Sequence, residues 1–161
     1  CTSGTIAIGS DRIKEEVNKT KPKAKVTTPI TAALKAFKHL GLKNIAVLTP
    51  YPKDVNATVY DYLINHNIGV ETFSSFNLEY DSEIAQVSLE SLEKEISKID
   101  LSNVDGLFVS CTALKIVDVL ERVESSQNTV VISSNQAIIW DCLRSVGIDS
   151  KIEGYGKLLV S

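Results

Sequence analysis

The sequence predicts a doubly wound α/β domain, in which a parallel sheet carries helices on both of its faces. Short apolar runs of strand length alternate with amphipathic segments of helix length between Thr28 and Val146. Such alternation is typical of parallel strands joined by right-handed crossovers. In this architecture ligands bind at the carboxyl ends of the strands, so the residues that follow each strand are the first place to look for a site.

The first helix and strand are the most clearly marked. Thr28 suits an N-cap, Pro29 suits the first helical turn, and Gly41 closes the helix. Four apolar residues recur between them at helical spacing: Ile30, Leu34, Phe37 and Leu40. The nearly continuous apolar run over 44–49 then predicts a strand that is buried on both faces.

The same unit repeats along the chain. We expect helices over 52–65, 88–99, 113–123 and 136–146, and strands over 69–73, 104–109 and 129–132. A further helix is expected over 11–18. The series predicts one complete, flavodoxin-like domain over residues 28–147.

The two flanks look like remnants of a second domain. Residues 1–27 contain a glycine-bearing stretch of small residues and a lysine-rich connector, and residues 148–161 are too short for a domain of their own. The apolar residues 158–160 nevertheless need a surface on which to pack. The chain also begins with Cys1 and lacks methionine, so we consider a mature lipoprotein, a self-processed N-terminal nucleophile hydrolase and a fragment of a longer protein.

Composition excludes several classes of protein. Seventeen basic residues against 20 acidic ones leave a formal charge of −3 over 161 residues, which disfavours a nucleic-acid binder. No apolar run approaches the roughly 18 residues of a membrane span, so we expect no membrane partner. Three cysteines without paired spacing fit neither a disulfide framework nor a zinc motif, and they predict a reducing, cytoplasmic location. Neither a GxGxxG nor a Walker motif is present, which disfavours nucleotide binding.

Small polar residues follow the predicted strands, at 49–51, 74–75, 110–112 and 133–135. Cys111 is the strongest candidate, because a helix starting near Ala113 would place it at a helix N-terminus that favours the thiolate. An inert buried cysteine is the alternative interpretation.

Six other residues are weighed between a functional and a structural role. Cys1 lies in a second cluster of small, hydroxyl-bearing residues, and Tyr51 is either a hydrogen-bond donor over the site or a packing aromatic. Asn135 either binds a carboxylate or caps the last long helix. Cys142, within an apolar helix, is expected to pack. The two histidines, His39 and His66, are expected at the surface.

Several strings resemble the aspartate/glutamate racemase superfamily, and within it the branch of maleate cis-trans isomerases, arylmalonate decarboxylases and EutA-like proteins. The strings are Thr28-Pro29, Ala32-Ala33-Leu34, Leu40-Gly41-Leu42, Val47-Leu48-Thr49-Pro50-Tyr51, Val109-Ser110-Cys111-Thr112-Ala113-Leu114, Ser133-Ser134-Asn135-Gln136-Ala137 and Trp140-Asp141-Cys142-Leu143-Arg144. The resemblance covers nearly the whole chain.

The resemblance implies two similar α/β domains, each of which presents a cysteine to a substrate between them. Residues 1–27 would then be the remnant of an N-terminal domain carrying the first cysteine, Cys1, and 148–161 a tail that returns to that domain. Cys111 would be the second cysteine. The resemblance further implies that Thr2, Ser3, Tyr51, Thr112 and Asn135 hold the substrate.

The function that this resemblance implies is a cofactor-independent isomerase of small mono- or dicarboxylic acids, with Cys1 as nucleophile and Cys111 as acid/base partner. An arylmalonate decarboxylase, an amino-acid racemase and a carboxylate-binding module without turnover remain alternatives. Decarboxylases of this branch carry glycine at the first cysteine position, so Cys1 favours the isomerase. The resemblance to maleate isomerases also implies a substrate-binding asparagine near residues 80–82, where this chain has none. We expect neither metal nor organic cofactor, and a second copy of the chain is an open partner.

Overall fold

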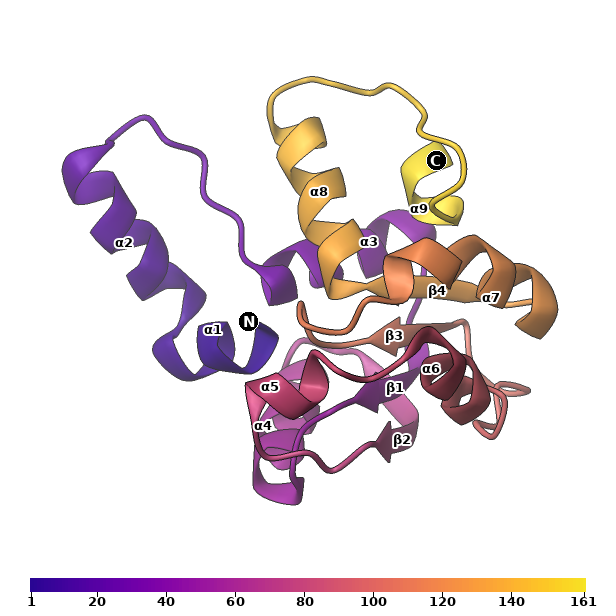
Figure 1. Cartoon of the computed structure of the whole chain (residues 1–161). Coiled ribbons are helices and arrows are strands. Elements are labelled where there is room, and N and C mark those ends of the chain that lie inside the picture. Colours follow the sequence, from indigo (N-terminus) through magenta and orange to yellow (C-terminus); the bar gives the residue numbers. More distant parts are fainter.

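The computed structural model describes residues 1–161 and contains one four-stranded parallel sheet (Figure 1). The strands are β1 (Asn44–Thr49), β2 (Gly69–Ser75), β3 (Gly106–Val109) and β4 (Val130–Ser133). They lie in the order β2-β1-β3-β4, and all three neighbouring pairs are parallel. This order is that of a flavodoxin-like sheet, so the predicted fold class is confirmed.

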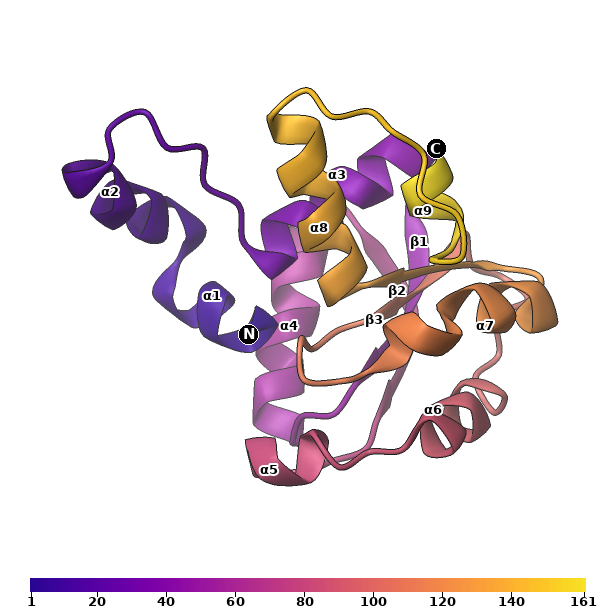
Figure 2. The same cartoon turned by 45° about the horizontal axis from the view of Figure 1, so that its top comes forward.

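Helices cover both faces of the sheet (Figure 2). One face carries α3 (Pro29–Leu40), α4 (Lys53–Asn65) and α8 (Ser134–Ser145), and the other carries α6 (Leu89–Ile96) and α7 (Leu120–Gln127). The chain moves from β1 to β2 in one direction and from β2 to β3 and β4 in the other. Right-handed crossovers therefore place α4 opposite α6 and α7.

The helix α3 forms for the reasons that its sequence predicts. Thr28 and Thr31 make a reciprocal capping box, Pro29 occupies the first turn, and Gly41 adopts φ 72° as the left-handed C-cap. The apolar face of α3 lies on the sheet, where the rings of Phe37 and Phe108 meet edge to face at 5.2 Å. This contact lies within one continuous core of 32 buried residues.

The predicted helix over 113–123 is wrong. A turn leads into a 3₁₀ turn over Ile116–Val119, and only then does α7 begin at Leu120. Leu114 and Ile116 are both fully buried, and two residues spaced by two cannot share one face of an α-helix. The segment after Cys111 is therefore a loop that wraps over the core. A short helix that the sequence pattern did not predict, α5 (Asp81–Ile84), lies in the crossover after β2.

The N-terminal segment lies beyond the carboxyl ends of the strands (Figure 1). The small residues that follow Cys1 form α1 (Thr2–Ile8), which packs on α3 and α4, and α2 (Ser10–Thr20) then extends away from the sheet without a buried residue. The helix expected over 11–18 is thus confirmed. None of the helices has both the length and the apolar character needed to cross a membrane.

The C-terminal tail packs on the sheet unit itself. Its helix α9 (Lys157–Val160) buries Leu158 and Leu159 against α8 and β4. Glu124 binds this tail, because its carboxylate accepts the amides of Val131 and Lys157 at 2.9 and 2.8 Å. The division of the chain into 1–27, 28–147 and 148–161 stays a prediction.

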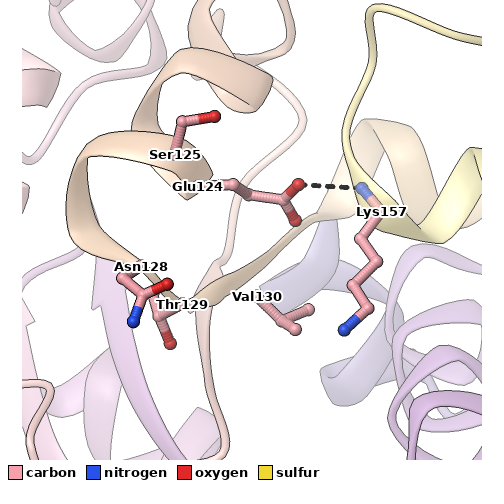
Figure 3. A pocket seen from close by; sticks show the side chains of 6 residues that line it. All are labelled: Glu124, Ser125, Asn128, Thr129, Val130 and Lys157. Atoms are coloured by element: carbon pink, nitrogen blue, oxygen red, sulfur yellow. Dashed lines mark hydrogen bonds between the residues drawn. The ribbon is translucent and has the colours of Figure 1, made fainter.

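A hollow of about 280 Å³ opens beside this carboxylate (Figure 3). It is lined by Glu124, Ser125, Asn128, Thr129, Val130 and Lys157. Because Val130 begins β4, the hollow lies at the amino end of the strand, opposite the edge where the sequence predicts a site. Burial raises the pKa of the Glu124 carboxyl.

Candidate active site

Two cysteines 110 positions apart in the sequence converge on Tyr51 at the carboxyl edge of the sheet. Tyr51 follows β1, and its ring is buried, with 4% of its surface exposed. Its hydroxyl lies 4.0 Å from Cys1 Sγ. Burial raises the pKa of the Tyr51 hydroxyl, and the neighbouring Cys111 thiol raises it further, whereas the Ser3 hydroxyl lowers it. Tyr51 therefore remains a neutral hydrogen-bond donor throughout the physiological pH range.

Cys1 is exposed and immediately precedes α1. Its sulfur lies 3.0 Å from Ser3 Oγ, two residues further along the chain. The first cysteine motif thus forms the start of a helix, and this geometry brings the thiol and the Ser3 hydroxyl together over Tyr51.

Cys111 is buried at the end of β3, with 3% of its surface exposed. The amide of Ala113 points to its sulfur at 3.4 Å. This donor belongs to a turn, since no helix begins at Ala113, and the helix dipole invoked from the sequence is absent from this position. Ser110, directly before Cys111, has a fully buried hydroxyl without a hydrogen-bond partner.

Asn135 does not cap α8. That role belongs to Ser133, whose hydroxyl accepts the Gln136 amide while the Gln136 side chain accepts the Ser133 amide. Asn135 instead donates from Nδ2 to the carbonyl of Thr112 at 3.0 Å, and so fixes the loop that follows Cys111. The pattern Ser-x-x-Gln is itself a capping-box signal and identifies the cap from sequence.

Thr2 is fully buried, and its hydroxyl lies 2.8 Å from Ser134 Oγ. Ser134 Oγ also accepts the amide of Cys111 at 3.2 Å. Sequence reasoning missed Ser134, because a serine beside a helix cap carries no signal for contacts with residues 23 and 132 positions away.

We call these residues the carboxyl-edge cluster; its members are Cys1, Thr2, Ser3, Tyr51, Ser110, Cys111, Thr112, Ser134 and Asn135. None of them is a lysine, arginine, histidine, aspartate or glutamate. A carboxylate here would be bound by hydroxyl and amide donors, which is how proteins stabilise charge that develops on an oxygen during a reaction. The two thiols supply groups that can act as nucleophile or proton donor.

The remaining candidates lie elsewhere. Cys142 is exposed on α8, so its predicted packing role is wrong: it lies on the face of the helix that points away from the core. His39 and His66 are both exposed, as expected.

The family model for arylmalonate decarboxylase matches residues 10–159. The chain belongs to this family. An arylmalonate decarboxylase from Bordetella bronchiseptica is 29% identical over 141 residues, which are 82% of this chain and 56% of that protein. The chain thus spans little more than half the length of this relative.

Two solved maleate isomerases share the fold of this family member. One is the enzyme from Pseudomonas putida S16, solved as a cysteine-to-alanine variant with maleate. Its TM-score is 0.93 at 21% identity, and the match covers 99% of this chain and 67% of the isomerase chain. A cysteine-to-serine mutant from Nocardia farcinica, with a covalently bound succinylcysteine intermediate, has a TM-score of 0.91 at 20% identity over 99% and 69%. These likenesses confirm the fold that the sequence predicts, and the match to the family model confirms the superfamily branch.

Proposed function

We propose that the protein is a cofactor-independent isomerase of small carboxylic or dicarboxylic acids. The observation that carries this proposal is the convergence of Cys1 and Cys111 on the hydroxyl of Tyr51. One thiol is exposed at the rim and the other is buried at the end of a strand, so the two sulfurs approach a shared point from different elements. Such a pair suits a reaction that needs two groups on opposite sides of one small substrate.

The proposed chemistry begins with the Cys1 thiolate. It adds to one carbon of the double bond of a cis-dicarboxylate, which forms a C–S bond and moves an electron pair towards the adjacent carboxylate. Cys111 donates a proton to the other carbon, and rotation about the new single bond follows. Cys111 then removes that proton, and loss of the Cys1 thiolate restores the double bond in the trans configuration. Atoms and charge balance, and both thiols return to their initial states.

The uncharged donors of the carboxyl-edge cluster match this charge movement. Tyr51, Ser3, Thr112 and Asn135 are the proposed carboxylate-binding residues, because hydroxyl and amide donors strengthen their hydrogen bonds as charge develops. A raised pKa keeps the Tyr51 proton available for donation. The succinylcysteine in the Nocardia farcinica isomerase supports an addition of this kind.

Two alternatives use the same residues. A two-thiol racemase would remove an α-proton with one cysteine and return one with the other, and the 29% identity to a decarboxylase favours loss of carbon dioxide. Cys1 favours the isomerase over the decarboxylase, since a decarboxylase needs only one thiol to protonate its product.

Proton NMR in deuterated water distinguishes these reactions. The protein would be incubated separately with maleate, aspartate, glutamate and an arylmalonate. We expect maleate to convert to its trans isomer, fumarate. Exchange of the α-proton for deuterium would support a racemase, carbon dioxide loss a decarboxylase, and silence on all four a carboxylate-binding role; any of these contradicts the isomerase.

A further inference from the structure

We propose that Ser134 is a positioning residue that couples the two cysteine-bearing segments, with Thr2 as its partner. This inference rests on the proposed function in one respect, namely that Cys1 and Cys111 act on the same substrate. It adds a positioning role for Thr2 to the carboxylate binding that the family resemblance implies.

Hydrogen-bond geometry places Ser134 between the two motifs. Its fully buried Oγ accepts the amide of Cys111 at 3.2 Å and lies 2.8 Å from Thr2 Oγ1. A hydroxyl has one proton and two lone pairs, so it can accept from the amide and still donate to Thr2. Thr2 is the residue next to Cys1 in the chain. Ser134 Oγ therefore contacts both the amide of Cys111 and the side chain that follows Cys1 in the chain.

The Ser134 hydroxyl is not needed to cap α8. The start of α8 is already capped by Ser133 and Gln136. Thr2 is also fully buried, which removes its hydroxyl from direct contact with solvent. Both hydroxyls are thus used between segments of the protein.

Few other side chains hold the first cysteine segment in place. The remaining side-chain hydrogen bonds from residues 1–10 to the sheet unit are a 3.3 Å contact between Ser10 and Thr28 and the 4.0 Å contact between Cys1 and Tyr51. The Thr2–Ser134 bond is the shortest of the three. Because an unpartnered buried hydroxyl is unfavourable, loss of either partner should shift α1 relative to β3.

Cross-linking of the two thiols tests this coupling directly. Dibromobimane fluoresces strongly when it joins two thiols, and the reaction would be run in a Cys142→Ser background so that only Cys1 and Cys111 remain. We expect Thr2→Val and Ser134→Ala each to lower the yield of the intramolecular cross-link at least fivefold. The double variant should show no further loss, because both changes remove one link. Thr2→Ser, which keeps the hydroxyl, should retain the parental yield.

A stability control separates positioning from folding. Ser88 caps α6 through its hydroxyl and lies outside the carboxyl-edge cluster, so Ser88→Ala should lower the melting temperature without changing the cross-link. The proposal is overturned if Thr2→Val and Ser134→Ala behave like Ser88→Ala. Failure of the parent to cross-link would overturn it as well.

The cross-link needs no substrate, so its result stands apart from the proposed function. A chain that converts none of the four acids but loses the cross-link in Ser134→Ala supports the coupling and rejects the isomerase. With an active protein, Ser134→Ala should lower kcat at least tenfold while KM changes less than threefold. An unchanged kcat contradicts a positioning role.

Discussion

The two cysteine segments are held in different ways. Cys111 lies two residues after β3, a strand in the middle of the sheet, and it is next to residues that are fully buried. Asn135 and Ser134 fix its loop. Cys1 precedes a seven-residue helix at the rim, with an exposed thiol and only a few side-chain bonds to the rest of the protein. The comparison teaches that the sheet fixes one half of the proposed reaction centre, while the other half depends on a small number of contacts.

Removal of a thiol has the largest expected effect. We expect Cys111→Ala to lower kcat/KM by about a thousandfold or more, because the buried thiol supplies the proton in the proposed reaction. The melting temperature should change little, and steady-state kinetics with circular dichroism would measure both. Cys142→Ala, outside the carboxyl-edge cluster, should keep full activity; retained activity in Cys111→Ala would reject the assignment.

Loss of the aromatic contact made by β3, the strand that leads to Cys111, tests how strongly the sheet supports that half. Phe108 is fully buried against Phe37, so Phe108→Ala should lower the free energy of unfolding by about 3–5 kcal/mol. Urea denaturation measures this change. Tyr80→Ala removes an aromatic ring that is 62% exposed, and it should cost less than about 1 kcal/mol. Equal losses in the two variants would contradict a packed support under Cys111.

Tyr51 lies where the two halves meet. We expect Tyr51→Phe to lower kcat/KM by roughly 10- to 100-fold, since one hydrogen bond to developing charge is lost. The change also has a pH signature. The pKa of this hydroxyl is raised in the folded state above its unfolded value of 10.0, so the stability it contributes is complete below pH 10 and is lost as pH rises further.

Wild-type protein should therefore lose unfolding free energy more steeply than Tyr51→Phe above pH 10. Urea denaturation between pH 8 and 11 provides the measurement. Parallel curves for the two proteins would show that the hydroxyl is not held neutral by the fold.

Alkylation rates test the difference in exposure between Cys1 and Cys111, and this is the smallest of the expected effects. Iodoacetamide near pH 7 should modify Cys1 about ten times faster than Cys111, which is 3% exposed. Cys142 is exposed but has no proposed role, so it should react more slowly than Cys1 if Cys1 is a reactive nucleophile. Peptide mass spectrometry would follow each thiol. Equal, slow rates at all three would favour a binding module without turnover.

Sequence alone determined the architecture and most of its elements. Apolar runs and amphipathic spacing predicted all four strands and the capped helix α3, because buried parallel strands and N-caps have local signatures. The residues that follow the strands named Tyr51 and Cys111 as candidates for the same reason: the carboxyl ends of parallel strands meet at one edge.

Only the tertiary structure decided how these residues meet. The loop after Cys111 replaces a predicted helix, because burial of both Leu114 and Ile116 overrides helical spacing. Ser134 gains its contacts from residues 23 and 132 positions away, and Asn135 bonds to a carbonyl in a neighbouring loop. Hydrogen bonds between distant segments depend on side-chain positions to within a few tenths of an ångström, and no local pattern encodes them.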